Sequence, residues 1–285
     1  MLKLIGLGLS LEFTTLRSIA ELINCDEVVI DSYTSAWFPS LDIVVQALKA
    51  MGKSVRIAKR EDLEGTATKY LIDMAKSKDV CVAVPGDPMI ATTHAALVVD
   101  AIKQGVEVVV VPSMSVINAI YGISCLQSYR IGKIATVVRP KNGIVYEYPL
   151  HVIRYNRERD LHTPLLLEID LEKGYFMTPR EALEILLDIQ HHLKLDVLSE
   201  DDKIVIIKAF GSRTSTIVYT SIKEVLDGIA ELEERTVYTI IVPARRLHPI
   251  EEECLQNIGK IVYRYSHIDI DLIKLLNILS KSANR

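Results

Sequence analysis

Short apolar runs alternate with longer segments of helical periodicity along the first 111 residues of the chain. This alternation predicts repeated strand–helix–strand units and a parallel sheet, because each crossover helix returns the chain to begin the next strand in the same direction. We expect strands at residues 2–6, 27–31, 54–57, 80–84 and 106–111, with crossover helices at 15–23, 41–51 and 92–103.

The alternation becomes less regular after Pro112, where predicted strands are not consistently separated by predicted helices. The clearest helix start is Thr178-Pro179-Arg180-Glu181, in which a Thr cap, a Pro in the first turn and a reciprocal Glu satisfy the free amides; Ser221 to Glu224 repeats the pattern. The sequence therefore predicts an α/β chain of two domains, with a five-stranded parallel sheet in residues 1–111 and a mixed sheet with helices in 112–285. The strands of the second sheet are expected at 134–138, 165–169, 204–210, 216–220, 237–242 and 261–265.

Composition supports a folded chain with a large core. The 285 residues are 49% hydrophobic and 25% charged, which suits two domains better than one. The formal charge of −4 gives no basic excess and argues against a nucleic-acid partner. The four cysteines lie far apart without a C-x-x-C pair, which predicts reduced, mostly buried thiols and excludes a zinc ribbon.

No membrane or export signal is recognised. The N-terminal residues lack the cationic stretch, apolar core and cleavage site of a signal peptide. The uncharged stretch 108–129 contains Pro112, Asn118 and Gln127, which argue against a membrane span. We therefore expect a cytoplasmic protein with no membrane partner.

The glycine turn Gly6-Leu7-Gly8-Leu9 follows the first strand and allows a ligand to approach the backbone. The dinucleotide fingerprint requires a third glycine where this chain has Leu11, so a nicotinamide site is disfavoured. Asp31, at the end of the second strand, is a candidate to bind a ribose, but capping of the turn at residues 33–35 explains it at least as well.

The turn Pro85-Gly86-Asp87-Pro88 follows the fourth strand at the carboxyl edge, where open α/β sheets bind ligands. It presents one carboxylate and bare backbone, although a plain strand-to-helix turn accounts for the same residues. Thr92 or Thr93 is expected to cap the next helix. These features make the carboxyl edge of the first sheet the candidate site.

The remaining polar patterns give no local catalytic or metal motif. His191-His192 is interpreted as a solvated helix face, and neither H-E-x-x-H nor G-x-S-x-G occurs. Arg245-Arg246 could meet an acidic partner, although a solvated pair is the simpler explanation. No metal is expected.

Several segments, in order over nearly the whole chain, carry a family pattern: Ile5 to Leu9, Tyr33-Thr34-Ser35, Pro85 to Pro88 continuing to Ala91-Thr92-Thr93-His94, residues 115–133, Leu161-His162-Thr163, Met177-Thr178, Val242-Pro243, Leu247-His248 and Glu251 to Glu253. Together they resemble the diphthine synthases, a branch of the tetrapyrrole methylase class of S-adenosylmethionine-dependent enzymes. The Gly-Asp-Pro turn marks the wider class, whereas Ala-Thr-Thr-His, Leu-His-Thr and Val-Pro are particular to the diphthine synthases.

The resemblance implies a methyltransferase with a donor cleft between two α/β domains, usually a homodimer. S-adenosylmethionine would be the methyl donor and S-adenosylhomocysteine the product. The protein substrate would be translation elongation factor 2, carrying a histidine extended by a 3-carboxy-3-aminopropyl group whose amino nitrogen is methylated. The compartment would be the cytoplasm of an archaeon or eukaryote.

The donor site is also carried over from the family. No catalytic residue is assigned, because the donor carries the reactive methyl group and the protein need chiefly bind and orient it. Family members have His or Asn near Ser115 where this chain reads Pro112-Ser113-Met114. Core packing is an equally good explanation of Phe210 and Tyr238. The implied donor-binding residues are Leu9, Asp87, Ile90, Ser115, Val116, Leu167, Phe210 and Tyr238.

Three other functions compete with this interpretation. A methyltransferase of the same class acting on a tetrapyrrole or on ribosomal RNA is the nearest. A non-catalytic nucleotide-binding module and a nicotinamide oxidoreductase come from other classes. Transfer of labelled methyl to a protein separates the first interpretation from all three.

Overall fold

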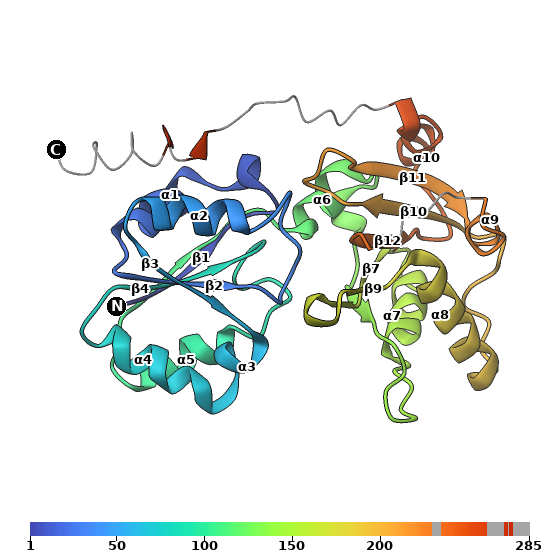
Figure 1. The fold of residues 1–285 in the computed structure, drawn as a ribbon. Helices are drawn as coiled ribbons and strands as arrows, with labels where there is room; N and C mark the ends of the chain where they lie inside the picture. The colour runs from blue at the N-terminus through green and yellow to red at the C-terminus, as the bar shows by residue number, and fades with distance from the viewer. Residues whose placement is uncertain (230–234, 261–270, 273, 276–285) are drawn as a thin grey trace. The chain divides into compact units, whose positions relative to one another are not determined.

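The computed structural model describes residues 1–229, 235–260, 271–272 and 274–275 (Figure 1). Contacts between residues divide the chain into two compact units, Met1–Ser115 with Tyr265–Arg285, and Val116–Arg264. The domain boundary drawn from the sequence at residues 111 and 112 stays a prediction. The structural division lies slightly later, and Leu272 packs into the core of the first unit.

The first unit is built on a five-stranded parallel sheet of order β3-β2-β4-β1-β5, as the sequence predicted. The two central strands, β1 and β4, are buried along their whole length. Helices cover both faces, so apart from the buried Lys3 of β1 these strands are apolar rather than alternating. The strands are β1 (Leu2–Gly6), β2 (Glu27–Asp31), β3 (Ser54–Ala58), β4 (Val80–Val84) and β5 (Val108–Val111).

Two helical layers enclose this sheet (Figure 1). On one face lie α1 (Leu16–Asn24) and α2 (Asp42–Ala50), and on the other α3 (Arg60–Leu63), α4 (Thr68–Ala75) and α5 (Ala95–Lys103). Successive residues of β1 point to opposite faces, so Ile5 packs with the first pair of helices and Leu4 with the second group.

The helix expected at 92–103 begins at Ala95 instead. Its cap position is His94, and no side chain caps it. Thr92 uses its hydroxyl to donate to the carbonyl oxygen of Pro88 at 2.6 Å, which fixes the preceding loop. The expected Thr cap was therefore wrong, because the helix begins only at Ala95, and Thr92 Oγ1 accepts a hydrogen bond from the amide of His94 at 3.4 Å within the preceding loop.

The second unit contains the predicted mixed sheet, in the order β11-β10-β12-β7-β6. Only β6 and β7 pair in parallel, and the other neighbours are antiparallel. Its strands are β6 (Ala135–Val137), β7 (Thr163–Leu167), β10 (Lys203–Lys208), β11 (Thr216–Ser221) and β12 (Tyr238–Val242), and a separate pair is formed by β8 (Ile169–Asp170) and β9 (Tyr175–Phe176). The strand expected at 261–265 lies outside the described residues.

The helices of the second unit are α6 (Val116–Ile123), α7 (Tyr148–Arg157), α8 (Pro179–Leu193), α9 (Ile222–Leu226) and α10 (Pro249–Gln256). Leu150 of α7 and Leu183 of α8 are fully buried and form one core with the sheet residues Leu165 and Ile240. Short 3-10 helices occur at η1 (Leu11–Phe13), η2 (Gly65–Ala67), η3 (Ser128–Arg130), η4 (Leu171–Lys173) and η5 (Ile258–Lys260).

Both predicted helix starts are confirmed, with one difference. Thr178 accepts a hydrogen bond from the amide of Glu181, and the pair Ser221 and Glu224 forms a reciprocal capping box. The Glu181 carboxylate does not return the bond to Thr178 but accepts one from the Tyr175 hydroxyl at 2.8 Å.

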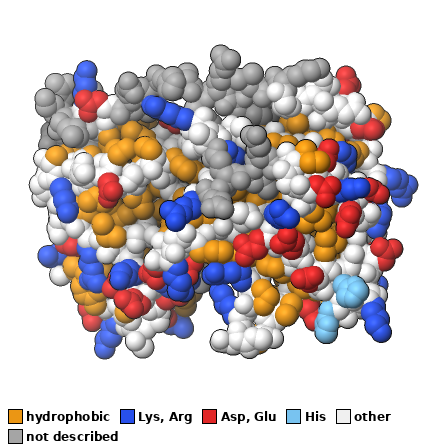
Figure 2. All heavy atoms as spheres, turned by 45° about the vertical axis from the view of Figure 1, so that its right-hand side comes forward, with side chains coloured by type: hydrophobic (Ala, Val, Ile, Leu, Met, Phe, Trp, Pro, Cys, Tyr) orange, Lys and Arg blue, Asp and Glu red, His pale blue; other side chains and the backbone are white. Residues whose placement is uncertain are grey.

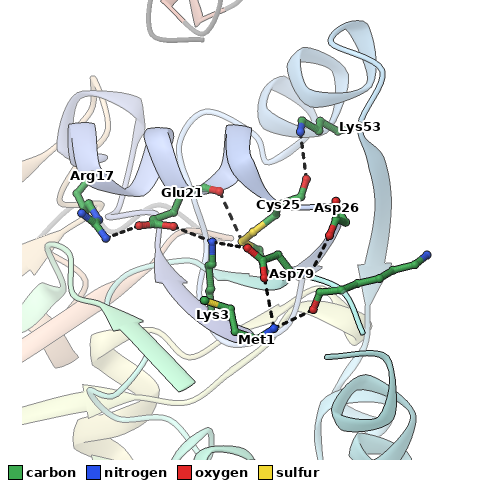
Figure 3. The surroundings of a disulfide bond; sticks show 10 residues. Met1, Lys3, Arg17, Glu21, Cys25, Asp26, Lys53 and Asp79 are labelled. Carbon is green, nitrogen blue, oxygen red and sulfur yellow. Dashed lines mark hydrogen bonds and ion pairs between the residues drawn. A yellow bond between two sulfur atoms is a disulfide. The ribbon is translucent and has the colours of Figure 1, made fainter. Parts of the chain in front are cut away.

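The cysteines correct the expectation of free thiols. Cys25 is bonded to Cys81 and Cys125 to Cys254, with Cα atoms 6.0 and 5.5 Å apart. Wide sequence spacing excludes a metal ribbon but not a disulfide, because folding brings distant segments together. The first bridge joins the end of α1 to β4, beside an ion cluster in which the buried Lys3 pairs with Glu21 and Asp79 (Figure 3).

No helix in the described part of the chain is long and apolar enough to cross a membrane. Lys and Arg side chains are interspersed with Asp and Glu over the face in view in Figure 2.

Candidate functional site

The ends of β1 and β4 form a backbone cradle in the first unit. The amide of Gly8 donates to the carbonyl oxygen of Gly86 at 3.1 Å, and the amide of Gly86 donates back to Gly8 at 2.6 Å. Both glycines have positive φ, +66° and +80°. A Cβ on Gly6 would lie 2.6 Å from that of Ser113, whereas the space at Gly86 is open, with Ser115 Cβ 4.0 Å away. The cradle is close-packed beneath and offers bare backbone at Gly86.

The carboxylate of Asp87 fixes this cradle from inside. The side chain is 6% exposed. Its Oδ1 accepts a hydrogen bond from the amide of Met89 at 2.9 Å, and its Oδ2 accepts one from the amide of Ser113 at 3.0 Å. Asp87 therefore ties its own loop to the segment that follows β5. Each oxygen has a further lone pair that a ligand could use.

The other sequence-predicted residues of this unit gather at the same edge. Leu9 and Ser115 are buried, and Ser115 lies beside Gly86. Ile90, in the loop after Asp87, is 39% exposed. The structure thus brings four of the eight candidates to the carboxyl edge of one parallel sheet, the position at which α/β folds bind ligands.

Asp31 caps a turn, and the ribose interpretation was wrong. Its Oδ1 accepts hydrogen bonds from the amides of Tyr33 and Thr34 at 2.8 and 2.9 Å, and its side chain is fully buried. His94 Nε2 lies 3.3 Å from Asp31 Oδ2, and His94 Nδ1 lies 3.1 Å from the carbonyl oxygen of Pro88. The Ala-Thr-Thr-His segment therefore links the turn after β2 to the Gly-Asp-Pro loop.

In the second unit, three candidates meet at one end of the mixed sheet. Leu167 of β7 is paired with Val137 of β6. On its other side β7 runs antiparallel to β12, where Leu166 pairs with Thr239. Tyr238 therefore lies opposite Leu167. Lys208 of β10 pairs with Tyr238, and Phe210 lies two residues beyond it. Leu167 and Tyr238 also belong to the buried core, so core packing and ligand contact remain compatible explanations. Val116 is half-buried and opens α6.

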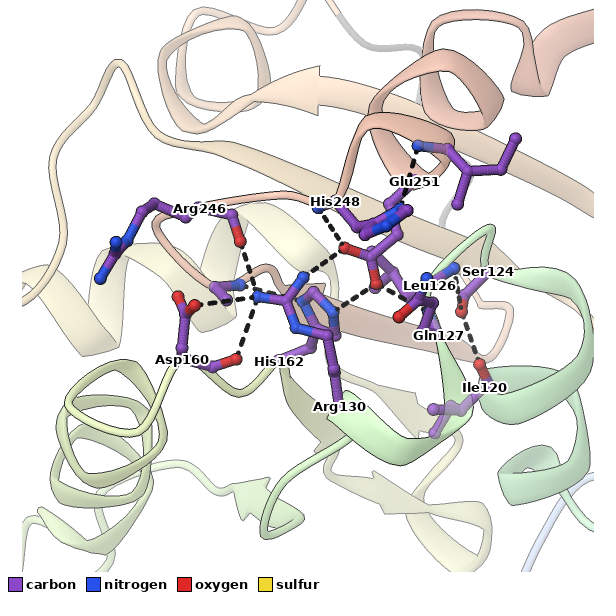
Figure 4. A network of polar contacts seen from close by, with 12 residues as sticks. Ile120, Ser124, Leu126, Gln127, Arg130, Asp160, His162, Arg246, His248 and Glu251 are labelled. Atoms are coloured by element: carbon purple, nitrogen blue, oxygen red, sulfur yellow. Dashed lines mark hydrogen bonds and ion pairs between the residues drawn. The ribbon is translucent and has the colours of Figure 1, made fainter.

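A buried polar network ties four segments of the second unit together (Figure 4). Glu251 of α10 accepts hydrogen bonds from Arg130, from His162 Nε2 at 2.9 Å, and from the amides of Gln127 and His248, both at 2.8 Å. The sequence motifs contained His162 and Glu251 but gave no reason to join them to Arg130. The sequence could not connect them, because Arg130 and His162 lie 121 and 89 positions from Glu251 and only folding brings them together.

His162 is neutral in this network. The amide of Ala244 donates to His162 Nδ1 at 3.0 Å, so the ring proton is on Nε2, facing Glu251. Burial lowers the pKa of His162, although the Glu251 carboxylate favours the protonated ring. Burial, the largest single effect, would raise the pKa of Glu251, but the hydrogen bonds from the amides of Gln127 and His248 and from His162 together lower that pKa. The network holds an ionised carboxylate against a neutral imidazole.

No group of three or more His, Cys, Asp or Glu residues in the described ranges could hold a metal ion. The site chemistry available in the described residues is therefore backbone donors, a buried carboxylate and apolar surface. Such a site suits binding and orientation of a reactive small molecule.

Comparison with known proteins identifies the family. The family model described as Tetrapyrrole (Corrin/Porphyrin) Methylases matches residues 1–226. A protein of Sulfurisphaera tokodaii named diphthine synthase is 36% identical over 259 residues, which cover 91% of this chain and 99% of that protein. The chain belongs to the diphthine synthase branch of the tetrapyrrole methylases. A diphthine synthase of Methanocaldococcus jannaschii is 34% identical over 259 residues, covering 90% of this chain and 98% of its own length.

A solved structure gives the same result for the fold. The crystal structure titled diphthine synthase matches with a TM-score of 0.77 and 31% identity, and the match covers 91% of this chain and 96% of that one. The predicted α/β class, with a parallel and a mixed sheet, is thus confirmed. Tetrapyrrole methylases and diphthine synthases are methyltransferases, and this protein is a methyltransferase of that family.

Proposed function

We propose that this enzyme transfers the methyl group of S-adenosylmethionine to the amino nitrogen of a histidine bearing a 3-carboxy-3-aminopropyl group, on translation elongation factor 2. The observation that carries the proposal is the match to diphthine synthases over nearly their whole length, 99% for the relative from Sulfurisphaera tokodaii. The segments particular to that branch form defined structure here, in the His94 link and the His162 network. Tetrapyrroles and ribosomal RNA are the competing acceptors.

We propose Leu9, Asp87, Ile90 and Ser115 as donor contacts of the first unit. The open backbone at Gly86 and the half-exposed Ile90 would accommodate an adenosyl group there. The free lone pairs of Asp87 suit hydroxyl or ammonium donors. The corresponding proposals in the second unit are Val116, Leu167, Phe210 and Tyr238.

The chemistry requires little of the protein beyond binding. S-adenosylmethionine supplies a methyl group on a sulfonium centre, which leaves as S-adenosylhomocysteine. The acceptor nitrogen forms the new N–C bond as the C–S bond breaks, and the proton of the nitrogen passes to solvent. The chain's residues hold the two reactants in line, which supplies several kcal/mol of the barrier reduction. Asp87 and Ser113 keep the cradle shaped before the donor arrives.

Mass spectrometry of the acceptor tests the proposal directly. Purified elongation factor 2 bearing the modified histidine, incubated with enzyme and S-adenosylmethionine, should gain methyl mass on that residue. The unmodified factor should gain none, because it lacks the carboxylate and amine that the pocket recognises. Equal transfer to the unmodified factor, or efficient transfer to ribosomal RNA or uroporphyrinogen, would contradict the assignment of the acceptor.

We also propose a homodimer, which the family resemblance implies and which is the commonest symmetric assembly of soluble enzymes. The elongation factor acts in the cytoplasm, and we propose the same compartment for this enzyme. Neither nucleic acid nor membrane is part of the proposed reaction.

A further inference from the structure

A charged cluster lies just beyond the row of candidate residues in the second unit. It consists of Arg139, Lys141, Glu168 and Tyr175, and we refer to it as the Arg139 cluster. Glu168 directly follows Leu167 at the end of β7, and its amide donates to the carbonyl oxygen of Val137 at 3.0 Å. Because β6 and β7 are parallel, Arg139 and Glu168 leave the sheet at the same edge.

Glu168 anchors the cluster. Its side chain is largely buried, and its Oε2 accepts a hydrogen bond from the amide of Arg139 at 2.7 Å. Lys141 Nζ lies 2.7 Å from Glu168 Oε1, and Arg139 Nε lies 3.4 Å from Oε2. Burial opposes ionisation, but these bonds prevail and lower the pKa of Glu168. One buried anion therefore holds two cations, and the carboxylates of Asp170 and Glu181 also lie within electrostatic range of Arg139.

Two contacts fix the orientation of the Arg139 guanidinium. Its Cζ lies 3.4 Å from the centroid of the Tyr175 ring, and Tyr175 is itself held by the hydrogen bond to Glu181. The ring fixes the plane of the guanidinium and Glu168 fixes its Nε edge. No described residue accepts a hydrogen bond from the Nη1 and Nη2 groups, and the side chain is 33% exposed. The result is a two-pronged donor whose plane is fixed and which matches the geometry of a carboxylate.

Two buried or half-buried arginines of the unit use terminal amino groups in contacts within the fold. Arg130 gives hydrogen bonds to Glu251 and to the carbonyl oxygens of Asp160 and Arg246. Arg157 binds the carbonyl oxygen of Val197 and the carboxylate of Asp202. Arg139 differs from these two because no described residue accepts a hydrogen bond from its terminal amino groups, and it differs from the exposed Arg154 and Arg180 of α7 and α8 because it lies next to Leu167.

We propose that Arg139 binds the carboxylate of the 3-carboxy-3-aminopropyl group of the acceptor, with Lys141 adding positive charge nearby. This inference rests on the proposed function, since that carboxylate is one of the two groups that distinguish the acceptor from plain histidine. A planar guanidinium binds a carboxylate through two parallel N–H···O bonds, which selects both charge and orientation. Orientation matters because the amine on the same carbon must point at the methyl group.

Steady-state kinetics of Arg139 variants test the inference. Arg139→Gln removes the charge and the fork, and should raise the KM for modified elongation factor 2 roughly 10-fold or more, the scale of a hydrogen bond to a charged group. Calorimetry should show the affinity for S-adenosylmethionine unchanged within about twofold. Arg139→Lys keeps the charge without the fork and should fall between wild type and Arg139→Gln.

Arg154→Gln is the matched control, because Arg154 lies on the exposed face of α7 and pairs only with Glu158 among the described residues. Its KM should equal that of wild type. An unchanged KM in Arg139→Gln would overturn the inference, and so would an equal loss of affinity for S-adenosylmethionine, which indicates a role in shaping the donor site. If Arg139→Gln does not fold, Arg139→Lys decides by the same two readouts. Absence of methyl transfer by the wild-type enzyme to the modified factor would instead contradict the proposed function.

Discussion

At the scale of single residues, the Asp87 carboxylate carries two backbone hydrogen bonds that connect separate loops. Asp87→Asn cannot keep both, because an amide has one acceptor oxygen and its NH2 group would face the amide of Met89 or Ser113. We expect a loss of about 1–3 kcal/mol in the free energy of unfolding, the cost of an unpaired buried donor. Weaker binding of S-adenosylmethionine should accompany it, since the loop that exposes Gly86 loses its anchor.

Denaturant unfolding without ligand and calorimetry with the donor measure the two effects. Asp100→Asn is a suitable control, because Asp100 is exposed on α5 and no described residue bonds to its carboxylate. Weaker binding at unchanged stability would mean that Asp87 acts as a ligand group alone. Unchanged binding at reduced stability would mean that it belongs only to the turn.

Residue roles were predictable where the partner is local. Asp31 caps the amides two and three positions onward, a relation visible in the sequence. The bond from Ser113 to Asp87 spans 26 positions, and the pairing of Cys25 with Cys81 spans 56. Such partners depend on which strands become neighbours, which a single sequence does not specify.

At the scale of elements, the His162–Glu251 pair joins the start of β7 to the first turn of α10. It gives the stability of the protein a defined pH dependence. The pKa of His162 is lowered in the fold, so below its ordinary value of 6.5 the unfolded chain binds a proton that the folded chain resists. The contribution of the pair is therefore complete above about pH 6.5 and declines as the pH falls below it.

Unfolding of the wild type and of His162→Gln by denaturant between pH 5 and 8 checks this, because Gln removes the titrating group. The stability advantage of the wild type should shrink on acidification, with Glu251 still ionised because its pKa is lowered. The nitrogen chemical shifts of His162 should show a proton on Nε2 throughout the upper part of that range. An advantage that grows on acidification would show that the folded ring is protonated, contrary to the bond from Ala244.

Element boundaries show where local pattern stops being informative. The strand expected at 165–169 ends at Leu167, because Glu168 turns to the amide of Arg139. The sequence pattern predicts a crossover between residues 58 and 79 but gives no bounds for the helices α3 and α4 that form there. The core strands were predicted well, since their apolar runs are long and bounded by turn residues.

At the scale of the whole molecule, the sequence predicts the class of each sheet but not its strand order. Alternating strands and helices require a parallel sheet. The order β3-β2-β4-β1-β5, with β1 between β4 and β5, is determined by contacts between residues far apart in the sequence. The packing of Leu272 in the first core was likewise not visible, because an apolar run does not by itself indicate which core it joins. The candidate residues were therefore found by motif, and their grouping at two sheet edges by the structure.

The final prediction concerns the stability of the whole chain with ligands. A ligand that binds only the folded state adds RT ln(1 + [L]/Kd), about 2.7 kcal/mol at a hundredfold excess over Kd. S-adenosylmethionine and S-adenosylhomocysteine should therefore each raise the melting temperature by several degrees. NAD shares the adenosine group, but its pyrophosphate needs the third glycine that Leu11 replaces, and it should leave the melt unchanged. Arg139→Gln should keep the full shift with both ligands, because we place that residue at the acceptor. A melt raised by NAD and unmoved by both sulfur ligands would reverse the assignment of the cradle at Gly8 and Gly86.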